Sequence, residues 1–389
     1  MKALVISPQP VFKPRGTPLS VYYRTLVTSE LGWTVDLLTY GEGDDIDIPG
    51  MRMIRIPRFR MLGNVKVGPS LLKLFLDGWM FLKMVWLLTF NRYDLIHAHE
   101  EAVFFCLFLK PIFRFRYVYD MHSSLPQQLT NFEFTKSRIL IRLFEVLEKR
   151  SLRSADAVIT ICQDLHDYAQ KILDHGQPHE LIENSLLDPV RLVNAPEGSA
   201  AESHPALPED DRIVVYAGTL EPYQGIELLL EAFSAVAATL PDVSLVVAGG
   251  NPDQVEHYRR QAGTLRIEDR CLFTGSVSRS AATAINRRAS VLVSPRISGG
   301  NTPLKVYEQI ASGIPLVATN IHSHTQVLNP AVAFLVEPNA ESLSAGLTRA
   351  LTDADEARRK VEAAQQLYAR KYARDIYVQK MARLLEPFA

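Results

Sequence analysis

The stretch SPRISGGNTPLKVYEQIASGIPLVATN, residues 294–320, decides the fold of the C-terminal half of this chain. It leaves a buried strand pattern, passes through a glycine-containing loop and enters a short helical pattern that ends before a second strand. Thr302 is a suitable N-cap, and Pro303 suits the first helical position. Gly313 suits the position just after the helix, where a left-handed backbone is common. These signals predict a helix over 303–312.

Two positive charges flank the start of this predicted helix. Arg296 ends the preceding strand pattern, and Lys305 lies in the first helical turn. Because the start of a helix carries a partial positive charge, a cation there is unfavourable unless an anionic ligand binds. Gly299 and Gly300 would let such a ligand approach the backbone closely. The pattern therefore favours a diphosphate.

Glu308 lies one turn deeper in the same predicted helix. A carboxylate there would not help to hold phosphate, but it can accept hydrogen bonds from the two vicinal hydroxyls of a ribose. The alternative is that Lys305 and Glu308 form an exposed helix pair worth roughly 0.2–0.5 kcal/mol. The glycine-containing loop in front of the helix favours the ligand-binding interpretation.

Short apolar runs alternate with helical patterns along the whole chain, which is typical of parallel sheets covered by helices on both faces. Each series of strands predicts one Rossmann-like domain, with ligands bound beyond the carboxyl ends of the strands. The expected fold class is α/β, with two Rossmann-like domains that face each other across a cleft. The first series lies at 3–7, 34–40, 51–57, 94–99, 116–122, 156–162 and 180–185, and the second at 212–218, 243–249, 270–275, 290–295, 315–320 and 333–338.

Length and composition agree with a two-domain globular protein. The chain has 389 residues, and its segment 188–211 is rich in Pro, Ala, Ser and Glu, as expected near a domain boundary. A net charge of -1 points to neither nucleic acid nor a membrane surface as a partner. The three cysteines show neither zinc-site spacing nor a disulfide framework, which favours a reducing compartment.

The N-terminal residues exclude two other classes of protein. MKALVIS is a short apolar run ended by PQP, which indicates a buried first strand and not a signal peptide. A nicotinamide-dependent dehydrogenase would carry G-x-G-x-x-G directly after this strand. The chain has VISPQPVFKPRGTPLS there, so that fingerprint is absent.

Residues 294–320, together with VVYAGTLEPYQGIELLLEAF at 214–233, resemble the nucleotide-sugar motif of the family 4 glycosyltransferases, which have the GT-B fold. VSLVVAGG and LFTGSV in the second half support this resemblance. In the first half, LGWTVDLLT, YDLIHAH, YDMHS and ENSLLD resemble the family more loosely. The resemblance extends over nearly the whole chain.

The resemblance implies transfer of a sugar, with retention of anomeric configuration and without a bound metal. The donor would be a nucleotide diphosphate sugar, with UDP favoured and GDP as the alternative, and the acceptor a glycan, a lipid-linked molecule or a small molecule. An acceptor-binding domain is expected over 1–190, a nucleotide-sugar-binding domain over 191–370, and a C-terminal helix over 371–389 that packs back toward the first domain. The other interpretations are a GT-B nucleotide-sugar epimerase and a pseudoenzyme that binds sugar nucleotides.

The chain departs from the family motif at its first glutamate. The family has two glutamates eight positions apart; Glu308 matches the second, which holds the ribose, whereas the first falls on Gly300. In the family the missing glutamate touches the donor sugar, so the identity of that sugar stays open.

The family also places an arginine and a lysine after the first strand of the second domain, and these positions fall on Thr219 and Gln224. We expect Arg296 and Lys305 to replace them as the catalytic cations that stabilise the leaving diphosphate. Further donor contacts are expected at Gly16, Thr17, Gly218, Gly249, Val277, Asn301, Thr302, Pro303 and Leu304, besides Thr219, Gly299, Gly300 and Glu308.

Three histidines end predicted strands in the first half. His122 aligns with a family histidine beside the donor sugar, which makes it a catalytic candidate; the alternative is a polar loop residue. His97 and His99 have the residue types of metal ligands, but they share a strand face with no clear third ligand. We therefore expect no metal and an acceptor-binding role. Arg15 is either an acceptor contact or a solvated side chain.

SLLKLFLDGWMFLKMVWLLTF, residues 70–90, predicts a helix that is too interrupted by charge to span a bilayer. Its apolar surface exceeds what packing against one sheet face needs. The helix is therefore either deeply buried or, with its basic neighbours, in contact with an anionic membrane. We expect a cytoplasmic location, with peripheral attachment to the inner face of the membrane if the second interpretation holds.

Overall fold

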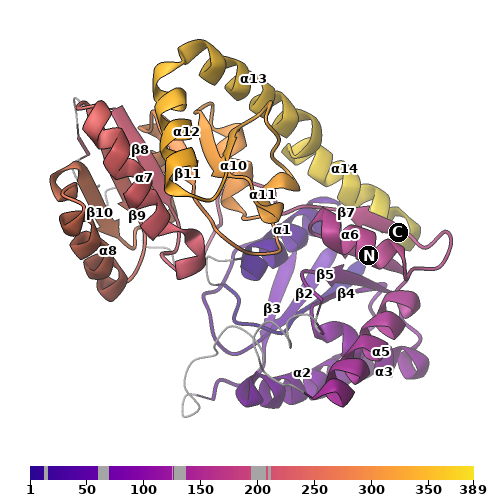
Figure 1. Ribbon diagram of the computed structural model, residues 1–389. Helices are drawn as coiled ribbons and strands as arrows, with labels where there is room; N and C mark the ends of the chain where they lie inside the picture. Colours follow the sequence, from indigo (N-terminus) through magenta and orange to yellow (C-terminus); the bar gives the residue numbers. More distant parts are fainter. Residues whose placement is uncertain (13–15, 60–69, 125, 127–136, 194–206, 209–211) are drawn as a thin grey trace. The chain divides into compact units, whose positions relative to one another are not determined.

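The computed structural model describes residues 1–12, 16–59, 70–124, 126, 137–193, 207–208 and 212–389. The chain divides into two compact units, each built on one parallel sheet (Figure 1). Unit 1 contains Met1–Pro196 and Arg374–Ala389, and unit 2 contains Glu197–Ala373. Arg15 and most of the expected boundary segment 188–211 lie outside the described residues.

Unit 1 has a seven-stranded sheet in the order β3-β2-β1-β4-β5-β6-β7. Alternate residues of β1 enter two cores: Leu4 and Ile6 pack with helices α2 and α3, whereas Ala3 and Val5 pack with α1 and α14. The strands are β1 Lys2–Ser7, β2 Thr34–Thr39, β3 Met51–Arg55, β4 Leu95–His99, β5 Tyr117–Met121, β6 Ala157–Thr160 and β7 His179–Leu181. The helices are α1 Gly16–Glu30, α2 Leu71–Phe90, α3 Ala102–Phe113, α5 Arg138–Ser154, α6 Gln163–Gln170, α14 Arg374–Leu385 and the short η5 Glu386–Phe388.

Unit 2 has a six-stranded sheet in the order β10-β9-β8-β11-β12-β13. Its faces are also both covered, since Val214 and Tyr216 enter one core and Ile213 and Val215 the other. The strands are β8 Arg212–Ala217, β9 Val243–Ala248, β10 Cys271–Gly275, β11 Val291–Ser294, β12 Leu316–Thr319 and β13 Phe334–Val336. The helices are η3 Pro222–Gln224, α7 Ile226–Thr239, α8 Pro252–Thr264, η4 Glu268–Arg270, α9 Arg279–Arg287, α10 Lys305–Ala311, α11 His322–Thr325, α12 Ala340–Thr352 and α13 Ala354–Lys371.

The α/β fold class is confirmed, and each expected strand overlaps an observed one. The bounds of the expected strand 180–185 were wrong, because β7 is His179–Leu181. The strand order adds information that the sequence lacked. In each sheet the order reverses beside the first strand of the unit, between β1 and β4 and between β8 and β11. Ligands of open α/β sheets bind beyond the carboxyl ends of the strands at such a reversal. The segments after β1 and β4, and after β8 and β11, are therefore the places to look for functional side chains.

The expected start of the motif helix was wrong. Helix α10 begins at Lys305, and the side chain of Thr302 does not cap it. The chain enters the helix through a tight turn, in which the N–H of Val306 donates to the carbonyl of Pro303 at 3.0 Å. The end of the helix is confirmed, since Gly313 follows with φ +78°. Because α10 has only seven residues, the case for an anion rests on side chains and not on the helix dipole.

Helix α2 is not deeply buried. Ser70 caps it, through a bond from the N–H of Lys73 to its side chain at 3.1 Å. Its buried residues form a single narrow stripe, whereas Trp79 and Trp86 are 40% and 50% exposed. The interpretation as a core helix is therefore wrong, and the outward side of α2 is apolar. The buried stripe consists of Leu76, Met80, Met84 and Leu87.

The C-terminal helix α14 belongs to unit 1. Its Tyr377 accepts a hydrogen bond from the guanidinium of Arg24 on α1. At the start of α14, Arg374 donates to Glu30 of α1 at 2.6 Å and to Asp188 at 3.1 Å. These bonds join the two ends of the chain around the unit 1 sheet.

Candidate active site

The strands β8, β9 and β10 of unit 2 run into glycines that touch one another. A Cβ atom on Gly249, which has φ +128°, would lie 1.9 Å from the carbonyl oxygen of Gly218. The N–H of Gly249 donates to the carbonyl of Gly275 at 2.8 Å. Only glycine fits this close approach, and the result is a bare backbone surface at the carboxyl end of β8.

Lys305 reaches this glycine surface from α10. A Cβ atom on Gly218 would lie 3.4 Å from its Nζ. The Nζ lies 4.0 Å from the centre of the Tyr216 ring, and it is buried with no hydrogen-bond partner among the described residues. Burial, and then the charge of Arg296, lower the pKa of Lys305 to about 7. A buried amine without an acceptor is costly unless a ligand supplies one.

Arg296 lies beside Lys305, held by the loop that follows β11. Its Nε donates to the carbonyl of Ser298 at 2.6 Å, and its guanidinium lies 5.1 Å from the centre of the Tyr223 ring. A Cβ atom on Gly299 would lie 2.0 Å from a guanidinium nitrogen of Arg296. The expected role of Gly299 was therefore incomplete, because its missing side chain makes room for Arg296. A Cβ atom on Gly300 would meet nothing within 4 Å, so that position is open.

Three buried polar side chains that sequence reasoning missed, Ser294, Thr319 and His324, form a series of hydrogen bonds that ends at the backbone of Arg296. The hydroxyl of Thr319 donates to the backbone carbonyl of Arg296. His324 bonds through Nδ1 to the carbonyl of Thr319 at 2.8 Å, and its Nε2 lies 3.0 Å from the hydroxyl of Ser294. Burial lowers the pKa of His324 to about 4, so the ring is neutral at neutral pH. The sequence did offer a signal for this group, because Ser294 and Thr319 are polar residues that end two neighbouring strands, β11 and β12.

The structure also describes the other residues of unit 2 that were expected to contact the donor. The side chain of Gln224 donates to the hydroxyl of Thr219 at 3.3 Å, so the two positions where the family has cations contact each other. Glu308 accepts from the hydroxyl of Thr283 at 3.4 Å and is half-buried. Val277 packs at the edge of a core. Asn301 is exposed, while Thr302, Pro303 and Leu304 are half-buried.

In unit 1, Asp120 draws the three histidines into one buried group. Its carboxylate accepts from Arg24 at 3.0 Å and lies 3.0 Å from Nε2 of His97. Nδ1 of His99 lies 3.0 Å from Nε2 of His122, which is itself 3.3 Å from Asp120. Sequence reasoning missed both Arg24 and Asp120, although Asp120 stands two positions before His122 on the same chain segment.

The charges of this group are settled by burial and by Arg24. Burial alone would raise the pKa of Asp120, but Arg24 outweighs it and holds that pKa well below the usual range. Burial lowers the pKa of His122 to about 4, so its ring is neutral and can accept or donate a hydrogen bond. His97 and His99 are completely buried, with 1% and 0% exposure.

The sequence predicted no third metal ligand beside His97 and His99, but the structure places Asp120 close enough to both to be one. One ligand atom each of His97, His99 and Asp120 lies within 4.8 Å of the others. However, Arg24 already neutralises Asp120 and is completely buried. A divalent cation would add uncompensated positive charge to this interior, which is strongly unfavourable. These residues fit a closed ion-pair network better than a metal site.

Glu100, directly after β4, is a further feature of the reversal point in unit 1. It has a left-handed backbone with φ 49°, which is uncommon for a residue other than glycine. The hydroxyl of Thr17, next to Gly16 at the start of α1, donates to it at 3.3 Å. Burial, and then the neighbouring Glu101, raise the pKa of Glu100 to about 7.

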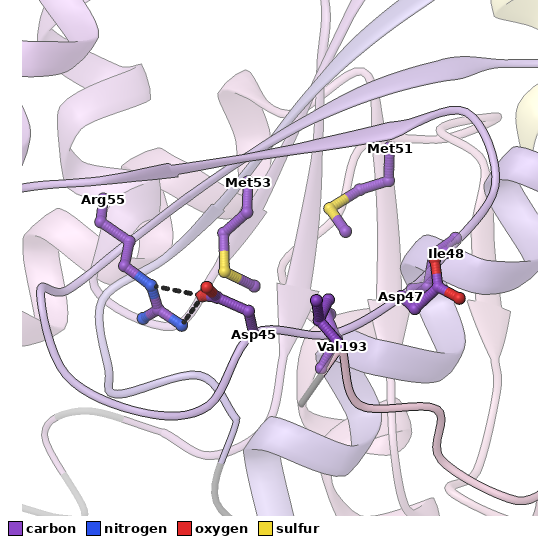
Figure 2. A pocket seen from close by; sticks show the side chains of 8 residues that line it. Asp45, Asp47, Ile48, Met51, Met53, Arg55 and Val193 are labelled. Atoms are coloured by element: carbon purple, nitrogen blue, oxygen red, sulfur yellow. Dashed lines mark hydrogen bonds and ion pairs between the residues drawn. The ribbon is translucent and has the colours of Figure 1, made fainter. Parts of the chain in front are cut away.

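A pocket of about 510 Å³ lies along the edge strand β3 (Figure 2). Arg55 and Asp45 form an ion pair at 2.8 Å across one end of it. None of the expected functional residues lines this pocket, so it does not belong to the candidate site. Its walls are formed by Asp45, Ile46, Asp47, Ile48, Met51, Met53, Arg55 and Val193.

Two doubly wound parallel sheets in one chain, together with the likeness of the whole chain to solved glycosyltransferase structures, show the GT-B fold class. Residues 23–181 match the family described as Glycosyl transferase 4-like domain, and residues 200–367 match Glycosyl transferases group 1. The chain belongs to the family 4 glycosyltransferases. No helix of the described segments combines the length and apolar character that crossing a membrane requires.

Similar proteins agree with this assignment. The phosphatidyl-myo-inositol mannosyltransferase of Mycobacterium leprae is 29% identical over 207 residues, which cover 52% of this chain and 54% of that protein. The chain thus spans about half the length of the curated relatives it matches. The sucrose-phosphate synthase of Thermosynechococcus elongatus has a TM-score of 0.72 at 20% identity and covers 99% of this chain and 98% of its own. The Anabaena protein HepE, in complex with UDP-glucose, has a TM-score of 0.69 at 17% identity and covers 100% of both chains.

Proposed function

We propose that this protein is a retaining glycosyltransferase that moves a sugar from a nucleotide diphosphate sugar to a glycan, a lipid-linked molecule or a small-molecule acceptor. The observation that carries the proposal is the buried Nζ of Lys305, which faces the glycine surface and finds no hydrogen-bond acceptor in the part of the chain that the structure describes. The neighbour that holds UDP-glucose favours a UDP-sugar, with a GDP-sugar as the alternative. The relatives named for phosphatidyl-myo-inositol favour a lipid-linked acceptor.

In this proposal, unit 2 binds the donor. Arg296 and Lys305 hold the diphosphate above Gly218, and Glu308 accepts hydrogen bonds from the ribose hydroxyls. Two cations match the charge of the diphosphate, so the site needs no bound metal. The open space at Gly300 lies where the family has its sugar-contacting glutamate, so the donor sugar is recognised by other groups.

The chemical step follows from these charges. The bond between the anomeric carbon and the diphosphate oxygen breaks, and the acceptor oxygen bonds to that carbon on the same face. The acceptor proton passes to the departing phosphate oxygen. Arg296 and Lys305 stabilise the negative charge that grows on the leaving group, and they do so from fixed positions, which is the most effective form of electrostatic catalysis.

Unit 1 binds the acceptor in this proposal. His122 contributes a neutral ring beside the donor sugar. Because His97 and His99 are completely buried, we assign them the role of holding His122 and Asp120 in place, whereas Arg15, Gly16 and Thr17 would contact the ligands directly.

We also propose that one side of unit 1 rests on an anionic membrane. Helices α2, α3 and α5 share one core and adjoin one another, with Phe81 5.7 Å from Phe105 and Phe104 5.8 Å from Phe144 between ring centres (Figure 1). We call their outward side the three-helix face. Its most exposed apolar residues, all at least 58% exposed, include Leu71, Leu74, Phe90, Phe108, Ile112 and Ile139.

The charges on these helices suit anionic lipids. Arg142, Lys149 and Arg150 of α5 are exposed, whereas the carboxylates of Asp77 and Glu148 are engaged with Tyr40 and Ser124. Amphipathic surfaces of this kind insert their apolar side chains between lipids and attract acidic headgroups. The three free cysteines suit the reducing cytoplasm, so we place the enzyme at the inner face of the membrane.

The test is a panel of UDP- and GDP-sugars incubated with the protein and with vesicles that contain phosphatidylinositol, followed by mass spectrometry. Transfer of a sugar supports the proposal. An epimerised donor would favour a GT-B epimerase, and binding without turnover would favour a pseudoenzyme. Arg296→Ala and Lys305→Ala should lower turnover more than they weaken donor binding, because the leaving group is more charged in the transition state.

A further inference from the structure

We propose that Lys305 takes up a proton when the donor binds: its amine is largely uncharged while the site is empty and becomes an ammonium ion when the diphosphate arrives. The inference deepens the proposed function and rests on it, because it takes Lys305 as a diphosphate contact. It makes donor binding dependent on pH through a single lysine.

The surroundings of Lys305 supply no group that would keep an ammonium ion charged, as far as the described residues extend. Tyr216 presents its ring, while its hydroxyl is used in a bond to the carbonyl of Thr219 at 2.6 Å. His324 is neutral, and Glu308, on the same helix, accepts a bond from Thr283. Among the described residues, the charged group that acts on Lys305 is Arg296, which has the same sign.

Two physical effects therefore oppose a charge on Lys305 in the empty site. Removal from water penalises the ammonium form, and repulsion by the nearby guanidinium adds to that penalty. Together they lower the pKa of Lys305 to about 7. The face of the Tyr216 ring attracts a cation only weakly by comparison. A diphosphate would reverse the balance, because opposite charge at short range favours the ammonium form.

Lys73 in unit 1 is also a buried lysine, but a carboxylate of the protein, that of Glu101, lies next to its amine. Its side chain is only 13% exposed, and its Nζ forms an ion pair with Glu101. Burial again acts to lower the pKa, but Glu101 and Glu100 outweigh it and the pKa of Lys73 is raised. The two lysines differ in whether a carboxylate is within reach. A diphosphate beside Lys305 would do what Glu101 does beside Lys73.

The sign of the pH dependence follows from this difference. Well below pH 7 Lys305 is charged with or without ligand, so affinity does not depend on it. Above pH 7 binding must first add a proton, so affinity falls by about tenfold for each pH unit until the pKa of the bound state is reached. At pH 8 most of the empty sites would be neutral, so binding should take up most of one proton.

Calorimetry tests this directly. UDP and GDP are titrated at pH 8.0 into the full-length protein in HEPES and in Tris, whose ionisation enthalpies differ, so that the change in observed heat gives the number of protons taken up. The terminal phosphate of either ligand is already ionised at this pH, and nearby cations would only lower its pKa, so the ligand adds no uptake. The wild-type protein should take up most of one proton per bound nucleotide. Lys305→Arg should bind with almost no uptake, and Lys371→Met, which removes an exposed lysine of the same unit, should match the wild type.

Two results overturn the inference: ligand binding without proton uptake, or equal uptake by wild type and Lys305→Arg. Carbon-13 labelling of the lysine side chains gives a second measurement that needs no ligand. The signal that Lys305→Arg removes should titrate near pH 7 in the empty protein, and titration near pH 10 would refute the inference. If that signal titrates near pH 7 but neither nucleotide binds, the proposed donor site is refuted while the neutral lysine stands.

Discussion

The substitution Gly299→Ala tests whether Arg296 is part of the donor site. The new Cβ atom would lie 2.0 Å from a guanidinium nitrogen of Arg296, so that side chain must leave its present position. The backbone at Gly299 has φ +131°, which an L-residue adopts only with strain of about 1–3 kcal/mol. The guanidinium is the end of a flexible side chain and can move away. The steric clash should therefore weaken ligand binding by displacing Arg296, and it should cost little stability.

The expected functional loss is the loss of one charge-assisted contact to phosphate, about 1.5–3 kcal/mol. This corresponds to roughly a 10- to 150-fold weaker affinity for a nucleoside diphosphate. Calorimetric titration with UDP and GDP measures this affinity, and a thermal melt measures the strain separately.

Gly300→Ala is the matched control, since a Cβ atom there meets nothing within 4 Å and its backbone lies outside the left-handed region. It should bind nucleoside diphosphates almost as tightly as the wild type. Equal affinities for the two alanine variants would refute the role of Arg296, because only Gly299→Ala displaces the guanidinium.

Three other predictions concern different parts of the molecule. Glu308→Gln should weaken nucleoside diphosphate binding by about 1–3 kcal/mol through the loss of charge-assisted bonds to ribose; calorimetry that finds an unchanged affinity would remove Glu308 from the site. Leu74→Glu and Leu82→Glu, at positions 70% and 61% exposed, should each reduce co-sedimentation with phosphatidylglycerol vesicles by about tenfold or more, while Val193→Glu, outside the three-helix face, should not; equal pelleting of all variants would contradict membrane contact. Asp120→Asn should destabilise unit 1 by about 3–5 kcal/mol, because Arg24 would keep a buried charge without its partner. The pKa of Asp120 is lowered on folding, so its contribution is present above the pKa of the unfolded chain and is lost as pH falls through the lower folded value; an acid denaturation series that is the same for wild type and variant would refute this.

The sequence by itself determined the elements of this protein. Most strand residues are apolar because both faces of each sheet are covered. Gly313 marks the end of α10 because its φ of +78° is costly for most other residues. Such signals are local, and they act on neighbours within a few residues, so they can be read from the order of residues alone. The family motif at 294–320 likewise lies on one continuous segment, which let the sequence point to Arg296, Lys305 and Glu308.

Only the tertiary structure decided how the functional side chains are partnered. Arg24 and Asp120 are 96 residues apart in the chain and meet because α1 and β5 pack together; no periodicity encodes that contact. The sequence predicts that α10 starts at 303, but it starts at Lys305, because the residues from Pro303 form a tight turn in place of the first helical turn. The absence of an acceptor for Lys305 among the described residues depends on every element packed near it. A pattern in sequence gives the position of a charge, but its partners and its burial are properties of the folded chain.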